Sequence, residues 1–424
     1  MNIIRKEKFI FVDYKDNHNK FWYIEEYDNG MIRTTWGRVG NKEAVSEKMF
    51  GSTASKEYDK LVKSKLKKGY TKLNTIDDNL SNLSNLTLES VALNEINYDK
   101  NNMNITNMIK YFCEKNIHKI TSNTSIVFDK NSNVFQTPCG IVTAESILEA
   151  GELLDKINDN YTKYGFCPDK VTNYVEYYCK LIPQKIKGRF EVYKIFPNIS
   201  SVKNQYDILD SLNETLKLIA DMNDANITST KLFNTSIVEV TDDKIITKIN
   251  NKFKKTHQSI HACRNLKVKR VFEIQIDKMN NDYNSLRNQW IKSGKRKNTK
   301  QLWHGTTAAN IISILKNGFI IPPANAKHVT GRMFGSSGLY LTDQSTKALN
   351  YAYGWWSGIR DKNCFMFLCD VMCGEQYIPK SSCSTIPSGY DSLFAKAGYS
   401  GVQNNEMIVP LNQVNPKYII EFFE

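Results

Sequence analysis

Residues 301–354 read QLWHGTTAANIISILKNGFIIPPANAKHVTGRMFGSSGLYLTDQSTKALNYAYG and contain one plan twice. A short apolar run predicts a strand at 302–304 and again at 338–342, and an amphipathic helix follows each run. The expected helix caps are Thr307 and Ser345, and the expected helix ends are Gly318 and Gly354. Each predicted strand ends on polar or aromatic residues, which is where α/β-type architectures place chemistry.

Five short motifs occur in order in and after this stretch: LWHGT from residue 302, VTGRMFG from 329, GLYLTD from 338, KALNY from 347 and NNEMIV from 404. Together they resemble the catalytic domain of the poly(ADP-ribose) polymerases, whose active site is marked by a His, a Tyr and a Glu. The residues at the matching places are His304, Tyr340 and Glu406. Any one motif is weak, whereas the ordered set over about a hundred residues is specific.

The resemblance implies that NAD+ is the co-substrate and that no cofactor is permanently bound. Cleavage of the bond between nicotinamide and ribose builds positive charge on the sugar, as glycoside hydrolysis does. A carboxylate at that ribose stabilises the transition state more than the ground state, and the resemblance implies Glu406 for this role. His304 would hold the adenosine-side ribose, with Thr306 nearby.

The same resemblance implies further residues of the NAD+ site. The main chain of Gly305 would pair with the nicotinamide amide, because only glycine lets a backbone approach so closely. Tyr340 and Tyr351 would face the cationic nicotinamide ring. Lys347 is expected to serve an acceptor or a phosphate, and Ala348 stands where the family carries a serine. Taken singly, each of these residues also has an ordinary structural explanation, in the core or at the surface.

Composition limits the classes of protein to consider. The chain has 424 residues, 41% hydrophobic and 24% charged, which gives room for two or three globular domains. Its net charge of +13 suggests a polyanionic partner, although part of that charge could be a solvated surface. Without a bilayer-spanning apolar run or a signal-peptide pattern, an intracellular protein with no membrane partner is expected. Nine irregularly spaced cysteines without a CxxC pair predict reduced thiols and no metal site.

Residues 1–75 combine alternating strands, a hairpin turn at 28–30 and a lysine-rich helix from residue 55. Trp36 beside Arg38, backed by such a helix, has the parts of a nucleic-acid site, although a core tryptophan and a solvated helix would give the same pattern. FWYIEEYDNGMIRTTWGRVG and KLVKSKLKKGY resemble the Trp-Gly-Arg (WGR) domain of DNA-dependent members of the same family. That resemblance implies DNA contacts from Trp36 and Arg38, to which the helix adds Lys63, Lys67 and Lys68.

The middle of the chain is expected to be helical. Residues 76–100 are polar and without a steady period, which predicts a linker, and amphipathic stripes over 101–225 predict a helical bundle. TPCGIVTAESILEAGELLDKI and CKLIP resemble the regulatory helical domain of DNA-dependent polymerases, which obstructs the NAD+ site until DNA engagement loosens it. Glu214 is a candidate latch that faces the donor site, or else an exposed helix carboxylate.

Residues 226–424 carry many expected strands and no GxGxxG motif, which argues against a Rossmann domain. The strands are expected at 236–241, 268–276, 302–304, 338–342, 364–372, 406–409 and 418–423. The resemblance implies a split mixed sheet wrapped by short helices. The predicted fold class is therefore multidomain α+β: a small β-rich domain with one helix, an all-α helical bundle and a C-terminal ADP-ribosyltransferase fold.

The expected function is a DNA-break-stimulated ADP-ribosyltransferase of the DNA damage response, which modifies proteins including itself and elongates the chains. Two alternatives stay open: an enzyme that adds a single ADP-ribose to protein or to DNA ends, and a DNA-end-binding scaffold with a silent catalytic domain. Asn404 and Met407 replace tyrosines of the long-chain polymerases, which puts long polymers in doubt and leaves room for an accessory protein at the acceptor site. The basic run at 292–300 is either a nuclear address, which would make the protein nuclear, or a loop before the catalytic strand.

Overall fold

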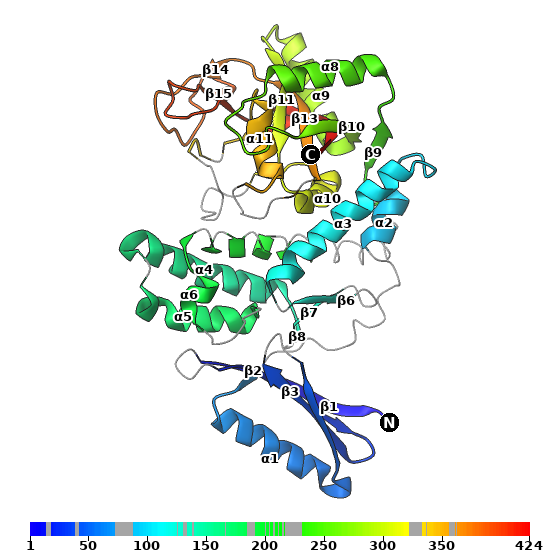
Figure 1. The fold of residues 1–424 in the computed structure, drawn as a ribbon, viewed down its shortest axis with the longest axis vertical. Helices are drawn as coiled ribbons and strands as arrows, with labels where there is room; N and C mark the ends of the chain where they lie inside the picture. Colours follow the sequence, from blue (N-terminus) through cyan, green and yellow to red (C-terminus); the bar gives the residue numbers. More distant parts are fainter. Residues whose placement is uncertain are drawn as a thin grey trace. The chain divides into compact units, whose positions relative to one another are not determined.

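The computed structural model divides the chain into two compact units (Figure 1). The first unit comprises residues 1–87 and 117–220, and the second comprises residues 88–116 and 221–424. The structure describes all residues except 14–17, 39–41, 73–87, 125, 130–133, 138–139, 166, 185–190, 200, 203, 207, 211, 214–215, 217–230, 322–332, 336, 356–360 and 362.

The first unit begins with a small antiparallel sheet and one helix, as the sequence predicts. The strands lie in the order β4-β3-β2-β1-β5. Their bounds are β1 (Ile3–Asp13), β2 (His18–Tyr27), β3 (Met31–Arg38), β4 (Ala44–Met49) and β5 (Thr71–Lys72), and the helix is α1 (Ala54–Lys67). The predicted hairpin turn is confirmed: Gly30 has a φ of +79°, and its N–H donates to the carbonyl of Tyr27 at 2.9 Å.

The two faces of this sheet have different cores. One face packs under α1 around Phe9, Trp22, Ile24, Ile32 and Tyr58. Ile10, Val12 and Phe21 from the opposite face join the core of the helical part of the same unit. The described helices and short strands of that part are β6 (Val127–Asp129), β7 (Val134–Thr137), β8 (Gly140–Ile141), α4 (Ala144–Tyr164), α5 (Pro168–Leu181) and α6 (Val192–Ile195).

Two predictions for the helical part can be compared with the structure. Thr143 caps α4, because its hydroxyl accepts from the N–H of Ser146 at 3.1 Å in a reciprocal capping box. The fourth predicted stripe, near residues 208–219, is described only in part. Glu214, the candidate latch, lies outside the described residues.

Residues 88–116 belong to the second unit, although the sequence predicted a linker up to residue 100. This segment contains α2 (Leu88–Glu95) and the first part of α3 (Met103–Asn123). The Glu95 carboxylate accepts from the N–H groups of Leu232 and Phe233 at 2.6 and 2.9 Å. The sequence missed α2 because it is only eight residues long and its burial depends on contacts distant in the sequence. The domain boundaries at 75, 100 and 225 stay predictions.

The second unit is built on two sheets that meet at one bridge. Their strand orders are β11-β13-β17-β10-β9 and β12-β16-β15-β14, and Trp303 of β11 bridges to Thr342 directly after β12. Among the paired strands of the described residues, β14 and β15 are the parallel pair, which makes the arrangement a split mixed sheet. The strands are β9 (Thr235–Glu239), β10 (Lys267–Ile276), β11 (Thr299–Gly305), β12 (Leu339–Leu341), β13 (Cys364–Met372), β14 (Gln376–Tyr377), β15 (Ser392–Ala395), β16 (Glu406–Val409) and β17 (Val414–Phe423).

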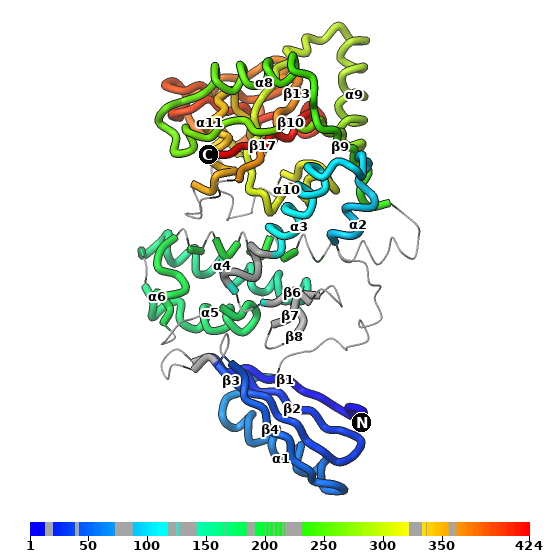
Figure 2. Tube along the Cα trace, turned by 45° about the vertical axis from the view of Figure 1, so that its right-hand side comes forward, coloured from blue at the N-terminus to red at the C-terminus, as the bar shows by residue number. Residues whose placement is uncertain are grey.

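Short helices from the same half of the chain lie around these sheets (Figure 2). They are α8 (Asp243–Lys255), α9 (Asp277–Lys292), α10 (Ala308–Asn317) and α11 (Ser345–Ala352). The sequence predicted α10 and α11 but missed α8 and α9, in which polar residues outnumber the apolar stripe. No helix among the described residues is long and apolar enough to cross a bilayer.

The basic run at 292–300 forms the end of α9, a turn and the start of β11. The N–H of Gly374 donates to the carbonyl of Lys297 at 3.0 Å, and Lys295 forms an ion pair with Asp391. These contacts favour the loop interpretation, because a nuclear address must be free to bind its receptor. The nuclear location stays a prediction.

Candidate functional site

Three adjoining strands bring the predicted catalytic residues His304, Tyr340 and Glu406 together. His304 is the penultimate residue of β11, Tyr340 is central in β12, and Glu406 begins β16. The ring Nδ1 of His304 lies 2.9 Å from the carbonyl oxygen of Tyr340. β12 in turn pairs with β16, with Tyr340 opposite Ile408. Residues far apart in the sequence therefore meet where the two sheets join.

The contacts of His304 fix its tautomer. A carbonyl oxygen only accepts, so Nδ1 must carry the proton and Nε2 keeps its lone pair. Burial lowers the pKa of His304, while the hydrogen bond to Tyr340 opposes that shift. The ring also packs edge-on against Phe319 at 4.7 Å. A neutral, immobilised imidazole with Nε2 as an acceptor suits a ribose hydroxyl, which is the predicted role.

Tyr340 is held in place by its hydroxyl. The O–H donates to the carbonyl of Gly335 at 2.9 Å, and the oxygen accepts from the N–H of Phe334 at 3.0 Å. These two bonds orient the ring, which also packs against the cluster around Phe334 and Ile408. Phe334 and Gly335 end the VTGRMFG motif, so the backbone of this motif holds the hydroxyl of Tyr340.

Gly305 of β11 lies close to the backbone of α11. A Cβ placed on Gly305 would overlap the carbonyl group of Ala348. A side chain of any size therefore requires α11 to move. This close approach brings Gly305 next to the helix that carries Lys347, Ala348 and Tyr351.

Glu406 and Lys347 form an ion pair at the site. The exposed fractions of the two side chains are 14% and 12%, so the pair is largely removed from water. Burial lowers the pKa of Lys347 to about 7, and the nearby carboxylate of Asp343 opposes the shift. Lys347 is therefore a neighbour that holds the position of Glu406, a role that the sequence analysis did not assign to it.

Replacing Lys347 by methionine is expected to reduce nicotinamide release roughly 10- to 100-fold, as misplacement of a catalytic group does. A free lysine keeps its proton until about pH 10.4, whereas Lys347 loses it near pH 7. The wild-type rate should therefore fall as the pH rises through neutrality, and Lys347→Met should lack this inflection. Initial rates from pH 6 to 9 at saturating NAD+ test this, with the exposed Lys278→Met as control. A Lys347→Met profile that keeps the wild-type inflection contradicts the assignment.

The sequence analysis missed three residues that position Glu406. The hydroxyl of Thr342 donates to the carbonyl of Asn405 at 2.6 Å, and the Asn405 amide donates to Asp343 at 3.0 Å. These bonds fix the turn that enters β16. The signal was present in the sequence, because Thr342 and Asp343 end the GLYLTD motif and Asn405 directly precedes Glu406.

The N-terminus of α11 differs from the prediction. Ser345 is inside the helix and does not cap it, and the N-cap residue is Gln344. The Ser345 hydroxyl donates instead to the carbonyl of Phe253 at 2.8 Å, which joins α11 to the end of α8. Thr307 is the N-cap of α10 as predicted, but its side chain makes no capping bond.

Ala348 is buried beside Gly305, at the place where the family carries a serine hydroxyl. Ala348→Ser should add one neutral hydrogen bond to the nicotinamide amide, worth ~0.5–1.5 kcal/mol. We expect a benzamide inhibitor to bind the variant roughly 2- to 10-fold more tightly, as measured by titration calorimetry. Ala352→Ser, one turn further along the same helix, is the matched control. Equal affinity of wild type and Ala348→Ser would show that this position does not face the amide.

In the first unit, Trp36 is at the surface of the sheet. Its indole is 39% exposed and lies on the α1 face, because Trp36 is opposite the buried Trp22 in the β2–β3 pair. Arg38, two residues further along β3, lies on the same face opposite Lys20. The alternative of a core tryptophan is therefore wrong for Trp36.

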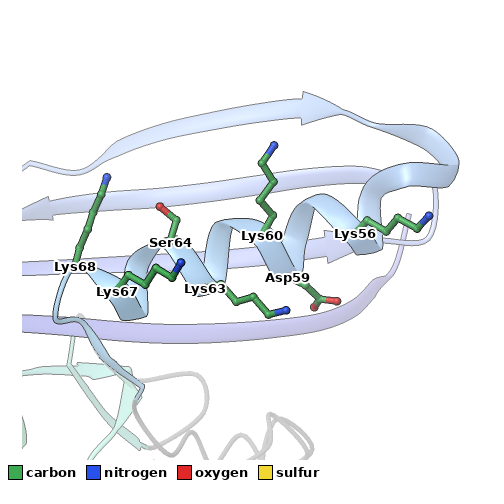
Figure 3. Close-up of a pocket in the computed structure, with 7 residues that line it drawn as sticks. All are labelled: Lys56, Asp59, Lys60, Lys63, Ser64, Lys67 and Lys68. Carbon is green, nitrogen blue, oxygen red and sulfur yellow. The ribbon is translucent and has the colours of Figure 1, made fainter.

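A lysine-rich surface runs along α1 (Figure 3). The residues that line a shallow depression on this surface are Lys56, Asp59, Lys60, Lys63, Ser64, Lys67 and Lys68. Burial lowers the pKa of Lys65, and the charges of Lys68 and Lys20 lower it further, so positive charge also extends toward β2. The predicted contacts Lys63, Lys67 and Lys68 thus share one surface. A concentration of cations of this kind suits a phosphate backbone.

Sequence models of two domain families match this chain. The model of the WGR domain matches residues 6–76, and the model of the poly(ADP-ribose) polymerase catalytic domain matches residues 244–422. The second range contains His304, Tyr340 and Glu406, and the first contains Trp36, Arg38 and the α1 lysines.

Curated relatives carry polymerase or transferase names. The chain is 23% identical to a protein named poly [ADP-ribose] polymerase 2 from Arabidopsis thaliana, over 85% of this chain and 59% of the relative. It is 26% identical to the Caenorhabditis elegans tankyrase over 81% of this chain, but over only 16% of that relative. A mouse protein named mono-ADP-ribosyltransferase PARP4 is 31% identical over 30% of this chain and 7% of its own length. The chain thus spans less than two thirds of the length of each of these relatives, and its two matched regions are a WGR domain and a poly(ADP-ribose) polymerase catalytic domain.

Proposed function

We propose that this protein is an NAD+-dependent ADP-ribosyltransferase. The observation that carries the proposal is the meeting of His304, Tyr340 and Glu406 on three adjoining strands within a matched catalytic domain. His304 would accept a hydrogen bond from the adenosine-side ribose, and Tyr340 and Tyr351 would face the nicotinamide. Glu406 would stabilise the positive charge that develops on the other ribose as nicotinamide leaves.

We further propose that DNA strand breaks stimulate this activity. The exposed Trp36 and the lysine surface of α1 support a contact in which lysines neutralise phosphates and the indole stacks on a base. The helical region would restrain the NAD+ site until DNA is bound. Such restraint needs little free energy, since a 100-fold activation corresponds to ~2.7 kcal/mol between closed and open states. A role in the DNA damage response follows from this proposal.

The acceptor and the product length divide the remaining possibilities. Protein side chains, including those of the enzyme itself, are the proposed acceptors, and chain elongation is the proposed outcome. The replacement of flanking tyrosines by Asn404 and Met407 favours short products, so transfer of a single ADP-ribose is the second candidate. An accessory protein that completes the acceptor site would be compatible with either product.

Labelled NAD+ tests these proposals directly. The protein is incubated with and without 5′-phosphorylated nicked DNA, products are resolved on a gel, and nicotinamide release is measured in parallel. DNA-stimulated incorporation as a ladder supports the full proposal, and one discrete product supports single transfer. Lys63→Gln/Lys67→Gln/Lys68→Gln should abolish stimulation and leave the basal rate unchanged. If the protein binds DNA but shows no incorporation and no nicotinamide release, the remaining function is that of a DNA-binding scaffold.

A further inference from the structure

A lysine ridge on α8 has no part in the function proposed above. This helix contains five lysines, and its one acidic residue, Asp243, is in its first turn. With 3.6 residues per turn, four of the lysines lie within about 80° of arc on one side of the helix. We define the lysine ridge as Lys244, Lys248, Lys252 and Lys255. The neighbouring side of the helix packs into the catalytic core through Ile245, Ile249 and Phe253.

The helix dipole favours Lys252 and Lys255, which lie in the last turn of α8, but it does not account for Lys244 and Lys248. Lys244, Lys248 and Lys255 are exposed, and within the described ranges no ridge lysine has an ion-pair partner. Like charges four residues apart on a helix repel each other and destabilise it. Some cations of the same unit are paired, for example Lys269 and Arg270, which both bind Glu421 at 2.8 Å. By contrast, Lys244, Lys248 and Lys255 form an exposed patch of positive charge on α8.

The C-terminal end of the ridge lies at the active site. The carbonyl of Thr256, directly after α8, accepts from the N–H of Ser345 in α11 at 2.9 Å. Burial lowers the pKa of Lys252, Asp343 opposes this shift, and the charges of Lys248 and Lys255 lower the pKa further. Asp343 accepts from Asn405, the residue before Glu406. The lysine ridge thus runs along α8 (Figure 1) to the end of the helix that contacts Ser345 of α11.

We propose that the lysine ridge is a second nucleic-acid contact, which binds the phosphates of a single strand beside the catalytic centre. It is separate from the WGR surface, because it belongs to the other compact unit. The inference builds on the proposed function only in placing the strand next to Glu406; the binding itself does not need catalysis. Lysines that neutralise phosphates release counterions, and this gives a salt-dependent affinity that can be measured.

The spacing of the ridge favours a nucleic acid over a chain of ADP-ribose. Lys244, Lys248 and Lys252 follow each other at about 6 Å along the helix axis. They form an even row of single cations. A nucleic acid strand carries one phosphodiester per nucleotide at regular intervals. An ADP-ribose chain carries its phosphates in adjacent pairs, separated by sugars and a base. The even row of Lys244, Lys248 and Lys252 matches the single, regularly spaced phosphates of a nucleic acid strand better than the paired phosphates of an ADP-ribose chain.

The test compares two sets of three substitutions in the full chain. Both sets are added to a protein that already carries Lys63→Gln/Lys67→Gln/Lys68→Gln, so that the WGR surface does not dominate binding. The ridge variant is Lys244→Gln/Lys248→Gln/Lys255→Gln, and the control is Lys278→Gln/Arg287→Gln/Lys292→Gln on α9, which removes the same charge. Anisotropy of a dye-labelled thymidine oligonucleotide is measured over a range of salt concentrations. The slope of log affinity against log salt is negative. Relative to the protein that carries only the three WGR substitutions, its magnitude should decrease by about 2 in the ridge variant and stay unchanged in the control.

Two outcomes would overturn the proposal. Equal slopes for the ridge variant and the α9 control would show that the ridge does not contact the strand. A ridge variant that keeps oligonucleotide binding but loses affinity for purified ADP-ribose polymer would assign the ridge to the polymer instead. Nicotinamide release by the wild type is measured in parallel with nicked DNA. Its absence there would refute the transferase function and leave the comparison of slopes valid.

Discussion

Glu406→Gln should reduce the rate of nicotinamide release about 10²- to 10³-fold, the loss typical of removing one group that stabilises charge in the transition state. Glutamine keeps the size and the hydrogen-bonding oxygen of the side chain but loses the negative charge. Because that charge acts on the developing sugar cation, the Michaelis constant for NAD+ should change little. Steady-state rates at several NAD+ concentrations separate the two effects.

Two comparisons make the Glu406 result interpretable. The exposed Glu375→Gln is the matched control and should be neutral. Lys347 loses its partner in Glu406→Gln, so Glu406→Gln/Lys347→Met is needed to separate the lost charge from an unpaired lysine. If Glu406→Gln retained more than about a tenth of the wild-type rate, the carboxylate would not be the group that stabilises the transition state.

Gly305→Ala should damage both the fold and the NAD+ site. The new methyl group would overlap the backbone carbonyl of Ala348, so α11 must move. Overpacking of this kind costs ~1–3 kcal/mol, which lowers the melting temperature of a domain of this size by roughly 2–12 °C. We also expect NAD+ turnover to fall about 100-fold, because α11 carries Lys347 and Tyr351 and a small displacement of reacting groups is costly.

Gly151→Ala provides the contrast for Gly305→Ala. Gly151 lies in α4, where an added Cβ meets nothing within 4 Å. Alanine is the better helix former by ~1 kcal/mol, so this variant should melt at the same or a slightly higher temperature. Differential scanning calorimetry and NAD+ turnover of both variants complete the experiment. Wild-type stability and turnover in Gly305→Ala would mean that β11 and α11 are not in close contact.

The strands around the active site could be predicted because their signals are local. The apolar runs at 302–304, 364–372 and 406–409 predicted β11, β13 and β16 within a few residues. The cap of α4 was also readable at Thr143, whereas the cap predicted at Ser345 was wrong. The roles of His304, Tyr340 and Glu406 came from resemblance to a family, and no apolar pattern could have supplied them.

What could not be predicted depends on contacts between distant parts of the chain. The ion pair of Lys347 with Glu406 joins residues 59 positions apart, and the bond between Ser345 and Phe253 joins residues 92 apart. α2 was assigned to a linker for the same reason, since its Glu95 is satisfied by backbone groups beyond residue 230. The sequence shows residue types and local hydrophobic periodicity. Neither of these specifies which distant backbone N–H groups will donate to a carboxylate such as that of Glu95.

The division of the chain into two units makes residues 117–220 an insertion. The second unit is built from the segments on both sides of this stretch, so the inserted helices leave it at residue 116 and return to it at residue 221. An unfolded stretch held at both ends is a closed loop, which has fewer conformations than a free tail of equal length. If the helices were to loosen, their two attachment points would stay fixed on one folded body. Refolding would then begin from a pre-closed loop, which favours a fast and repeatable return to the folded helices.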